Sequence, residues 1–87
     1  MELVITVPDY DKSLGVPGSN VEGQKIEVVI EDGEVGIWAN KEGLVSLATS
    51  ILTLAQDTIP TGHHIHLGSH SDLEEGSIDL ILGKNIR

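Results

Sequence analysis

The sequence of 87 residues contains no cysteine and no phenylalanine, and Tyr10 and Trp38 are its only aromatic residues. The absence of cysteine excludes a disulfide, a thiolate metal ligand and a cysteine nucleophile. The scarcity of aromatic residues means that the hydrophobic core must be built from aliphatic side chains. Trp38 is therefore an unusual residue in this chain.

Basic residues are also scarce, with five against fourteen acidic ones, which gives a formal net charge of −9. This balance argues against nucleic-acid binding, because contacts to phosphate groups need lysine and arginine. It argues equally against adsorption to an anionic membrane surface. A basic protein partner is compatible with the charge, since the field would speed its approach, although solubility alone also explains it.

No apolar run approaches the roughly 20 residues that a membrane-spanning helix needs. The first residues, Met1 to Val4, lack the basic and hydrophobic regions of a secretory signal. We therefore expect a cytoplasmic protein. Residues 1–87 are expected to form a single small domain, near the lower limit of what folds alone.

The first half of the chain predicts strands. Residues 2–7 alternate, whereas prolines and glycines break the pattern over residues 8–24, so we expect a long mobile loop there. Residues 25–31 and 34–39 alternate on either side of Asp32-Gly33, a strong hairpin signal. Pairing across this turn places Glu27 opposite Trp38.

The next segment predicts a helix that begins after Asn40, whose side chain can accept a hydrogen bond from an early helical N–H group. The face of this helix opposite its apolar stripe is polar but uncharged. This face is therefore either tolerated in solvent or packed against another surface. A homodimer that uses this face or an exposed strand edge is one alternative. The expected core stripe comprises Leu44, Leu47, Ala48, Ile51, Leu52 and Ala55, and the uncharged face comprises Ser46, Thr49, Ser50 and Thr53.

The segment from Gly62 to Leu67 predicts a strand with three histidines, and residues 78–82 predict the last strand. If the two pair in antiparallel fashion, His66 lies near Asp79. The expected fold is α+β, with a single, mostly antiparallel sheet in the order β-β-β-α-β-β and one helix packed on one face.

Alternation places His64 and His66 on the sheet face away from the helix, together with Trp38 and Asp79. An exposed tryptophan on an open sheet face favours a contact surface, so these four are the candidate partner-binding residues. Scattered surface hydrophobic residues are the alternative interpretation. The same face is expected to carry Val4, Glu27, Val29 and Ile81.

A His-x-His pair on a strand can also supply two nitrogen ligands to a metal ion, so a small metal-binding domain remains an alternative. His66 beside Asp79 resembles the oriented base of hydrolase triads, but no serine lies in a strained-turn motif. We therefore expect neither an enzyme nor a cofactor. A third metal ligand would come from His70, Asp72, Glu74 or Asp79.

Several segments together resemble a small family of immunity proteins from bacterial polymorphic toxin systems. Members share a helix that starts with an Asn/Glu-Gly-Leu segment, a Gly-His-x-x-His-Leu strand and a Leu-Glu-x-Gly-Ser turn. The resemblance covers about residues 38–82 and rests on Asn40–Leu44 (NKEGL), Leu47-Ala48, Leu52, Leu54-Ala55, Pro60–Leu67 (PTGHHIHL), Leu73–Ser77 (LEEGS) and Leu80-Ile81.

The resemblance implies a cytoplasmic bacterial protein that binds and neutralises a cognate toxin without catalysis. A basic toxin, such as a nuclease, would complement the acidic charge. The shared Gly-His segment has two interpretations, since it either contacts the toxin or maintains the fold while the contacts lie elsewhere. A regulatory homodimer and the metal-binding domain are the other candidate functions.

Overall fold

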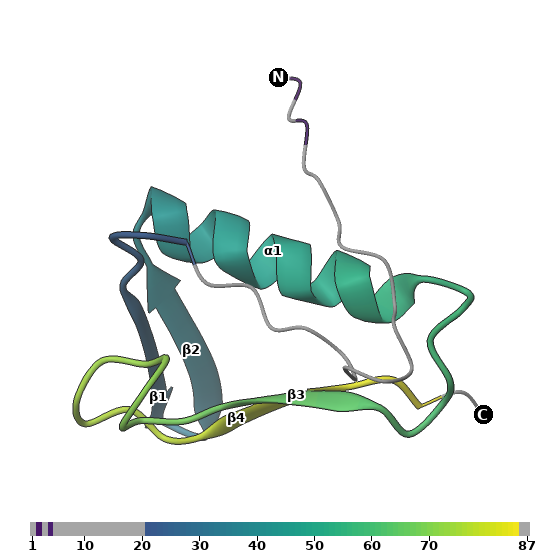
Figure 1. The fold of residues 1–87 in the computed structure, drawn as a ribbon. Coiled ribbons are helices and arrows are strands. Elements are labelled where there is room, and N and C mark those ends of the chain that lie inside the picture. Colours follow the sequence, from purple (N-terminus) through teal and green to yellow (C-terminus); the bar gives the residue numbers. More distant parts are fainter. Residues whose placement is uncertain (1, 3, 5–20, 86–87) are drawn as a thin grey trace.

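The computed structural model describes Glu2, Val4 and residues 21–85. In chain order it contains strands β1 (Ile26–Glu31) and β2 (Glu34–Ala39), helix α1 (Lys41–Ala55), and strands β3 (His64–Leu67) and β4 (Leu80–Gly83) (Figure 1). The predicted α+β class is confirmed. Most of the predicted strand at residues 2–7 and of the loop at residues 8–24 lies outside the described residues. Within the described part of the chain, no helix is long and apolar enough to cross a bilayer.

The predicted hairpin is confirmed with its register. Glu27 pairs with Trp38, Val29 with Gly36 and Glu31 with Glu34. Asp32 and Gly33 turn the chain with φ angles of 51° and 78°. A two-residue turn with both φ angles positive matches the right-handed twist of the flanking strands, which explains why the Asp-Gly pair fixes this register.

Asn40 joins the start of the helix to the segment that precedes β1. Its Oδ1 atom accepts hydrogen bonds from the backbone N–H groups of Gly43 (2.9 Å) and Lys25 (3.0 Å). Its Nδ2 group donates to the carbonyl oxygen of Gly23 at 2.9 Å. The predicted helix cap is therefore confirmed, and the same side chain also holds two distant parts of the chain together.

The prediction for the buried face of α1 is wrong for most of the expected core stripe, although Leu47 is buried as expected. Leu44, Ile51 and Leu52 of the expected core stripe are exposed, with Ile51 at 52%. The uncharged face faces inward instead, and its four polar side chains are all buried, from 1% exposed for Thr53 to 9% for Thr49. This face packs within the chain, so it is not available to a second copy.

Two features explain why the helix buries its small polar residues. Glycine at position 43 allows close packing, because a Cβ atom there would lie 2.6 Å from the carbonyl oxygen of Lys25. The threonine hydroxyl groups form hydrogen bonds within the helix. Thr49 donates to the carbonyl oxygen of Val45 at 2.8 Å, and Thr53 donates to that of Thr49 at 2.7 Å. Burial of these hydroxyls therefore leaves no unmade hydrogen bond.

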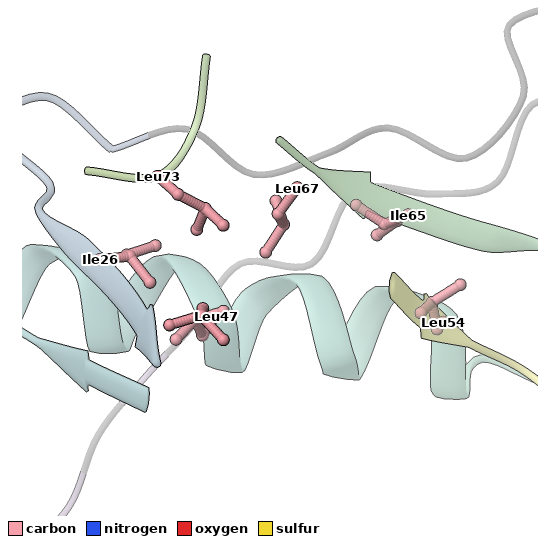
Figure 2. Packing of buried hydrophobic residues seen from close by; sticks show 7 residues of the cluster. Ile26, Leu47, Leu54, Ile65, Leu67 and Leu73 are labelled. Atoms are coloured by element: carbon pink, nitrogen blue, oxygen red, sulfur yellow. The ribbon is translucent and has the colours of Figure 1, made fainter. Parts of the chain in front are cut away.

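The hydrophobic core lies between α1 and the strands, and it is aliphatic as predicted (Figure 2). The hairpin, the helix, the histidine strand and the loop before β4 all contribute to it. In the hairpin, Ile26 and Val28 of β1 belong to this core and Ala39 of β2 packs against it, whereas Ile30, Val35 and Ile37 are exposed. The buried cluster comprises Ile26, Val28, Leu47, Leu54, Ile65, Leu67 and Leu73.

The expected single sheet is not confirmed, because the described strands form two separate antiparallel pairs, β1–β2 and β3–β4. Residues 74–78 connect the pairs by running alongside β1. The N–H of Glu74 donates to the carbonyl oxygen of Ile26 (2.8 Å), and that of Ile78 donates to the carbonyl oxygen of Val28 (3.0 Å). The last strand therefore begins two residues later than predicted, and Leu67 pairs with Leu80 rather than Ile78.

Candidate functional site

His66 and Asp79 lie together on the exposed face of the β3–β4 pair, as predicted. The Nε2 atom of His66 is 3.2 Å from the Oδ2 atom of Asp79, and each side chain is about half exposed. The two are not direct partners in the sheet, because His66 pairs with Ile81. Asp79 therefore reaches His66 diagonally across the strands, a distance that long side chains can bridge.

A backbone group fixes the other oxygen of Asp79. The N–H of Ser69 donates to Oδ1 at 3.0 Å. This bond to the ionised form is the largest cause that lowers the pKa of Asp79 below its ordinary value, and the hydrogen bond from His66 adds to it. Asp79 thus holds the chain after β3 in place, a structural role that accounts for its position without any reaction.

His64 lies at the start of β3 and is exposed, opposite Gly83. Its side chain shares the outer face of the strand with His66, whereas Ile65 and Leu67 are buried. The predicted alternation of this strand is confirmed. His63 precedes the strand and is half-buried, and its carbonyl oxygen accepts a hydrogen bond from the N–H of Lys84 at 2.9 Å, which extends the pairing by one step.

Trp38 lies on β2 with 69% of its surface exposed. Its indole ring lies over Gly36, since a Cβ atom at position 36 would be 2.9 Å from the indole Nε1 atom. The absence of a side chain at Gly36 therefore lets the ring lie close to the sheet. One part of the ring is supported by the backbone while the rest is open to a partner.

A shallow hollow of about 370 Å³ adjoins the indole. We call it the Trp38 hollow, and the hydrogen bonds of residues 74–78 to β1 explain how Glu74 comes to line it. Two acidic side chains that are 47 positions apart in the sequence, Glu27 and Glu74, thus line the same hollow as Trp38. The hollow is lined by Lys25, Glu27, Trp38, Ala39, Asn40 and Glu74.

The structure thus divides the four predicted contact residues between two strand pairs. His66 and Asp79 are in contact, and His64 shares their strand pair. Trp38 lies on the other pair, where Glu27 and Glu74 are its neighbours. The expected single face with Trp38 beside the histidines therefore becomes two separate groups.

The candidate metal ligands do not converge in the part of the chain that the structure describes, where no group of three or more acidic or histidine side chains could hold an ion. Asp72 accepts a hydrogen bond from the hydroxyl of Ser71 at 3.0 Å, within its own turn. Glu74 lies at the Trp38 hollow instead of beside the histidines. Among the described residues, the one ion pair of the His-x-His motif joins His66 to Asp79.

Comparison with known protein families matches residues 34–85, more than half of the chain, to the family described as Immunity protein 32. The chain belongs to the Immunity protein 32 family. This confirms the resemblance that the helix start, the histidine strand and the Leu-Glu-x-Gly-Ser turn indicate. No curated protein and no solved structure matches the chain.

The part of this Immunity protein 32 chain that matches the family includes Trp38, both outer histidines and Asp79. It begins at Glu34, so β1 lies outside it. Two residues that line the Trp38 hollow, Lys25 and Glu27, therefore belong to the part of the chain that the family model does not cover.

Sequence reasoning missed the Trp38 hollow because its two acidic residues come from distant segments. The pairing of Glu27 with Trp38 follows from the hairpin pattern, but the approach of Glu74 depends on the loop that lies alongside β1. Glu74 has only a Leu-Glu-x-Gly-Ser turn as its sequence signal. That turn predicts a change of direction and does not say which strand the loop contacts.

Proposed function

We propose that this Immunity protein 32 family member binds a cognate bacterial toxin and neutralises it without catalysing a reaction. The observation that carries the proposal is the family match over residues 34–85. The acidic charge supports a partner with a basic surface, because opposite charges speed association and fix its orientation. We further propose that the protein acts in the cytoplasm of the cell that makes the toxin.

The proposed mechanism is occlusion, in which the inhibitor covers the active site of the toxin. Exposed aromatic residues commonly anchor such interfaces, so Trp38 is the proposed anchor. The His64, His66 and Asp79 group is a second proposed contact, on the other strand pair. Its acidic carboxylate is held in a fixed position by Ser69, which favours a rigid contact surface over a flexible one.

Co-expression tests the proposal. The gene directly upstream is expected to encode a toxin that arrests growth when expressed alone and permits growth when expressed with this protein. The two purified proteins should form a stable complex, and the inhibition should be complete at one equivalent of inhibitor. Normal growth of cells that express the upstream gene alone would contradict the proposal.

The stoichiometry tests the non-enzymatic part separately. An inhibitor that acts by occlusion leaves residual toxin activity in proportion to the unbound toxin, so a titration should bend at equimolar protein. Loss of all toxin activity at far lower ratios, with chemical change of the toxin detected by mass spectrometry, would show an enzyme instead.

A further inference from the structure

We propose that the Trp38 hollow receives a lysine or arginine side chain of the toxin. This inference rests on the proposed function, because it names the chemistry of the contact that a toxin would make. The hollow has a volume of about 370 Å³, near the lower end of the roughly 300–1,000 Å³ of ligand sites. It therefore has room for a side chain, whereas a large ligand would extend beyond it.

The acidic residues of the hollow form no ion pair with another residue in the described part of the chain. Among the residues that the structure describes, the ion pair between His66 and Asp79 is the one that forms. Glu27 and Glu74 line the hollow without an ion pair in that part of the chain. Two acidic side chains that line one hollow make it attractive to a cation, because opposite charges attract.

The indole supplies a second attraction for the same ligand. A lysine or arginine cation over the face of an aromatic ring is attracted by its negative π face, and tryptophan is the best of the aromatic residues for this contact. Trp38 pairs directly with Glu27 across the hairpin, so the ring and one carboxylate adjoin. An aromatic surface beside two carboxylates is the chemistry that recognises a basic side chain.

Lys25 also lines the hollow, and its charge is expected to have the opposite effect on binding from the charges of the two glutamates. Its positive charge opposes the entry of another cation and reduces the attraction of the two glutamates. Removal of this charge should therefore strengthen binding, whereas removal of the glutamate charges should weaken it. A hollow that serves only to bury apolar groups would show neither change.

The test measures the affinity for the product of the upstream gene. Trp38→Leu keeps an apolar side chain without the π system, and Glu27→Gln/Glu74→Gln removes the charges without changing shape. Asp57→Asn/Glu75→Gln removes the same charge from two exposed residues outside the hollow, so it is the matched control. Circular dichroism confirms that each variant is folded.

We expect Trp38→Leu and the Glu27→Gln/Glu74→Gln variant each to raise the dissociation constant about tenfold or more, as buried hot-spot contacts do. The control should change it by no more than about twofold, as exposed charges that do not line the hollow do. Lys25→Met should lower it by a fewfold. Equal weakening in the glutamate variant and the control would overturn the inference, because only total charge would then matter.

A labelled tryptophan gives a second readout, because the chain has a single one. With 5-fluorotryptophan at position 38, the fluorine resonance should shift when the unlabelled toxin binds. A complex that forms and neutralises the toxin without moving this resonance would overturn the inference and leave the proposed function intact. Absence of any complex would instead refute the proposed function, and the inference with it.

Discussion

The orientation of α1 can be tested by a stability experiment on two residues one turn apart. Both belong to the apolar stripe of the helix, but one is buried and the other is exposed. Leu47 is buried, with 8% of its surface exposed, whereas Ile51 is 52% exposed. The sequence pattern predicts that both are core residues. The structure predicts that truncation to alanine destabilises the fold much more at Leu47 than at Ile51.

The expected magnitudes follow from burial. Leu47→Ala removes side-chain atoms from a packed cluster and leaves a cavity, which costs about 2–5 kcal/mol of the free energy of unfolding. Ile51→Ala removes three carbon groups worth about 0.8 kcal/mol each when fully buried, so half burial leaves about 1 kcal/mol. The higher helix propensity of alanine offsets part of that, by up to about 0.5 kcal/mol.

Urea denaturation measures the change in the free energy of unfolding, and thermal denaturation measures the change in the melting temperature, each followed by far-ultraviolet circular dichroism. For a domain of this size, 1 kcal/mol corresponds to about 4–8 °C in the melting temperature, so Leu47→Ala should lower it by at least about 8 °C. Ile51→Ala, with a net cost of about 0.5–1 kcal/mol, should lower it by about 2–8 °C and by less than Leu47→Ala does. Equal destabilisation by the two substitutions would refute the orientation of the helix and restore the apolar stripe as its buried face.

Three further predictions concern the helix start and the acidic residue of β3–β4. Gly43→Ala should destabilise the fold in urea denaturation, because overpacking against a backbone oxygen costs about 1–3 kcal/mol and exceeds the propensity gain of at most about 1 kcal/mol; a stabilised variant would contradict the close helix contact. Asn40→Ala should lower the free energy of unfolding by about 1–2 kcal/mol, as the loss of a helix cap does, and thermal denaturation measures this change. Asn40→Asp keeps the acceptor oxygen and should therefore lower it by less. Equal losses in the two variants would contradict the Oδ1 contacts. The lowered pKa of Asp79 means that its stabilisation is present above its unfolded-state pKa and is lost as the pH falls through the folded value. Asp79→Asn should therefore reduce the loss of stability on acidification, and His66→Gln should leave most of the pKa shift in a carboxyl NMR titration; a full return to the ordinary value would contradict the role of Ser69.

Local pattern was sufficient to predict the hairpin and the faces of the histidine strand. The Asp-Gly turn admits few backbone geometries, so one choice of turn fixes all six cross-strand pairs. Strict alternation then places Ile65 and Leu67 in the core and the two outer histidines in solvent. In both cases the information lies within a few residues of the feature that it determines.

The buried face of α1 could not be predicted in the same way, because hydrophobicity was not the deciding quantity. Glycine, serine and threonine on one face let the helix approach the strands closely, and hydrogen bonds to the preceding turn remove the usual cost of burying a hydroxyl. Dense packing then favours the small face. The absence of charge on that face was the one sequence signal that indicated burial.

The candidate contact residues were predicted individually but not as an arrangement. His66 lies beside Asp79 although the predicted register was two residues off, because Asp79 bridges a diagonal rather than a direct pair. Trp38 lies on the separate pair β1–β2, and residues 74–78 run alongside β1 of that pair instead of extending the histidine hairpin. Contacts between distant segments of this kind leave no trace in periodicity.

The two faces of strand β1 have different surroundings, the hydrophobic core on one side and the Trp38 hollow on the other. Ile26 and Val28 point inward and are almost completely buried, so the core depends on them. Glu27 of β1 and Lys25, which directly precedes the strand, alternate with them and line the Trp38 hollow. Because successive side chains of a strand point to opposite faces, the charge of the hollow can change at these two positions without altering any core contact. The proposed contribution of Lys25 and Glu27 to partner recognition is therefore separable from the contribution of β1 to stability. If the proposal holds, these are the positions at which a new specificity for the charge of a partner would be engineered.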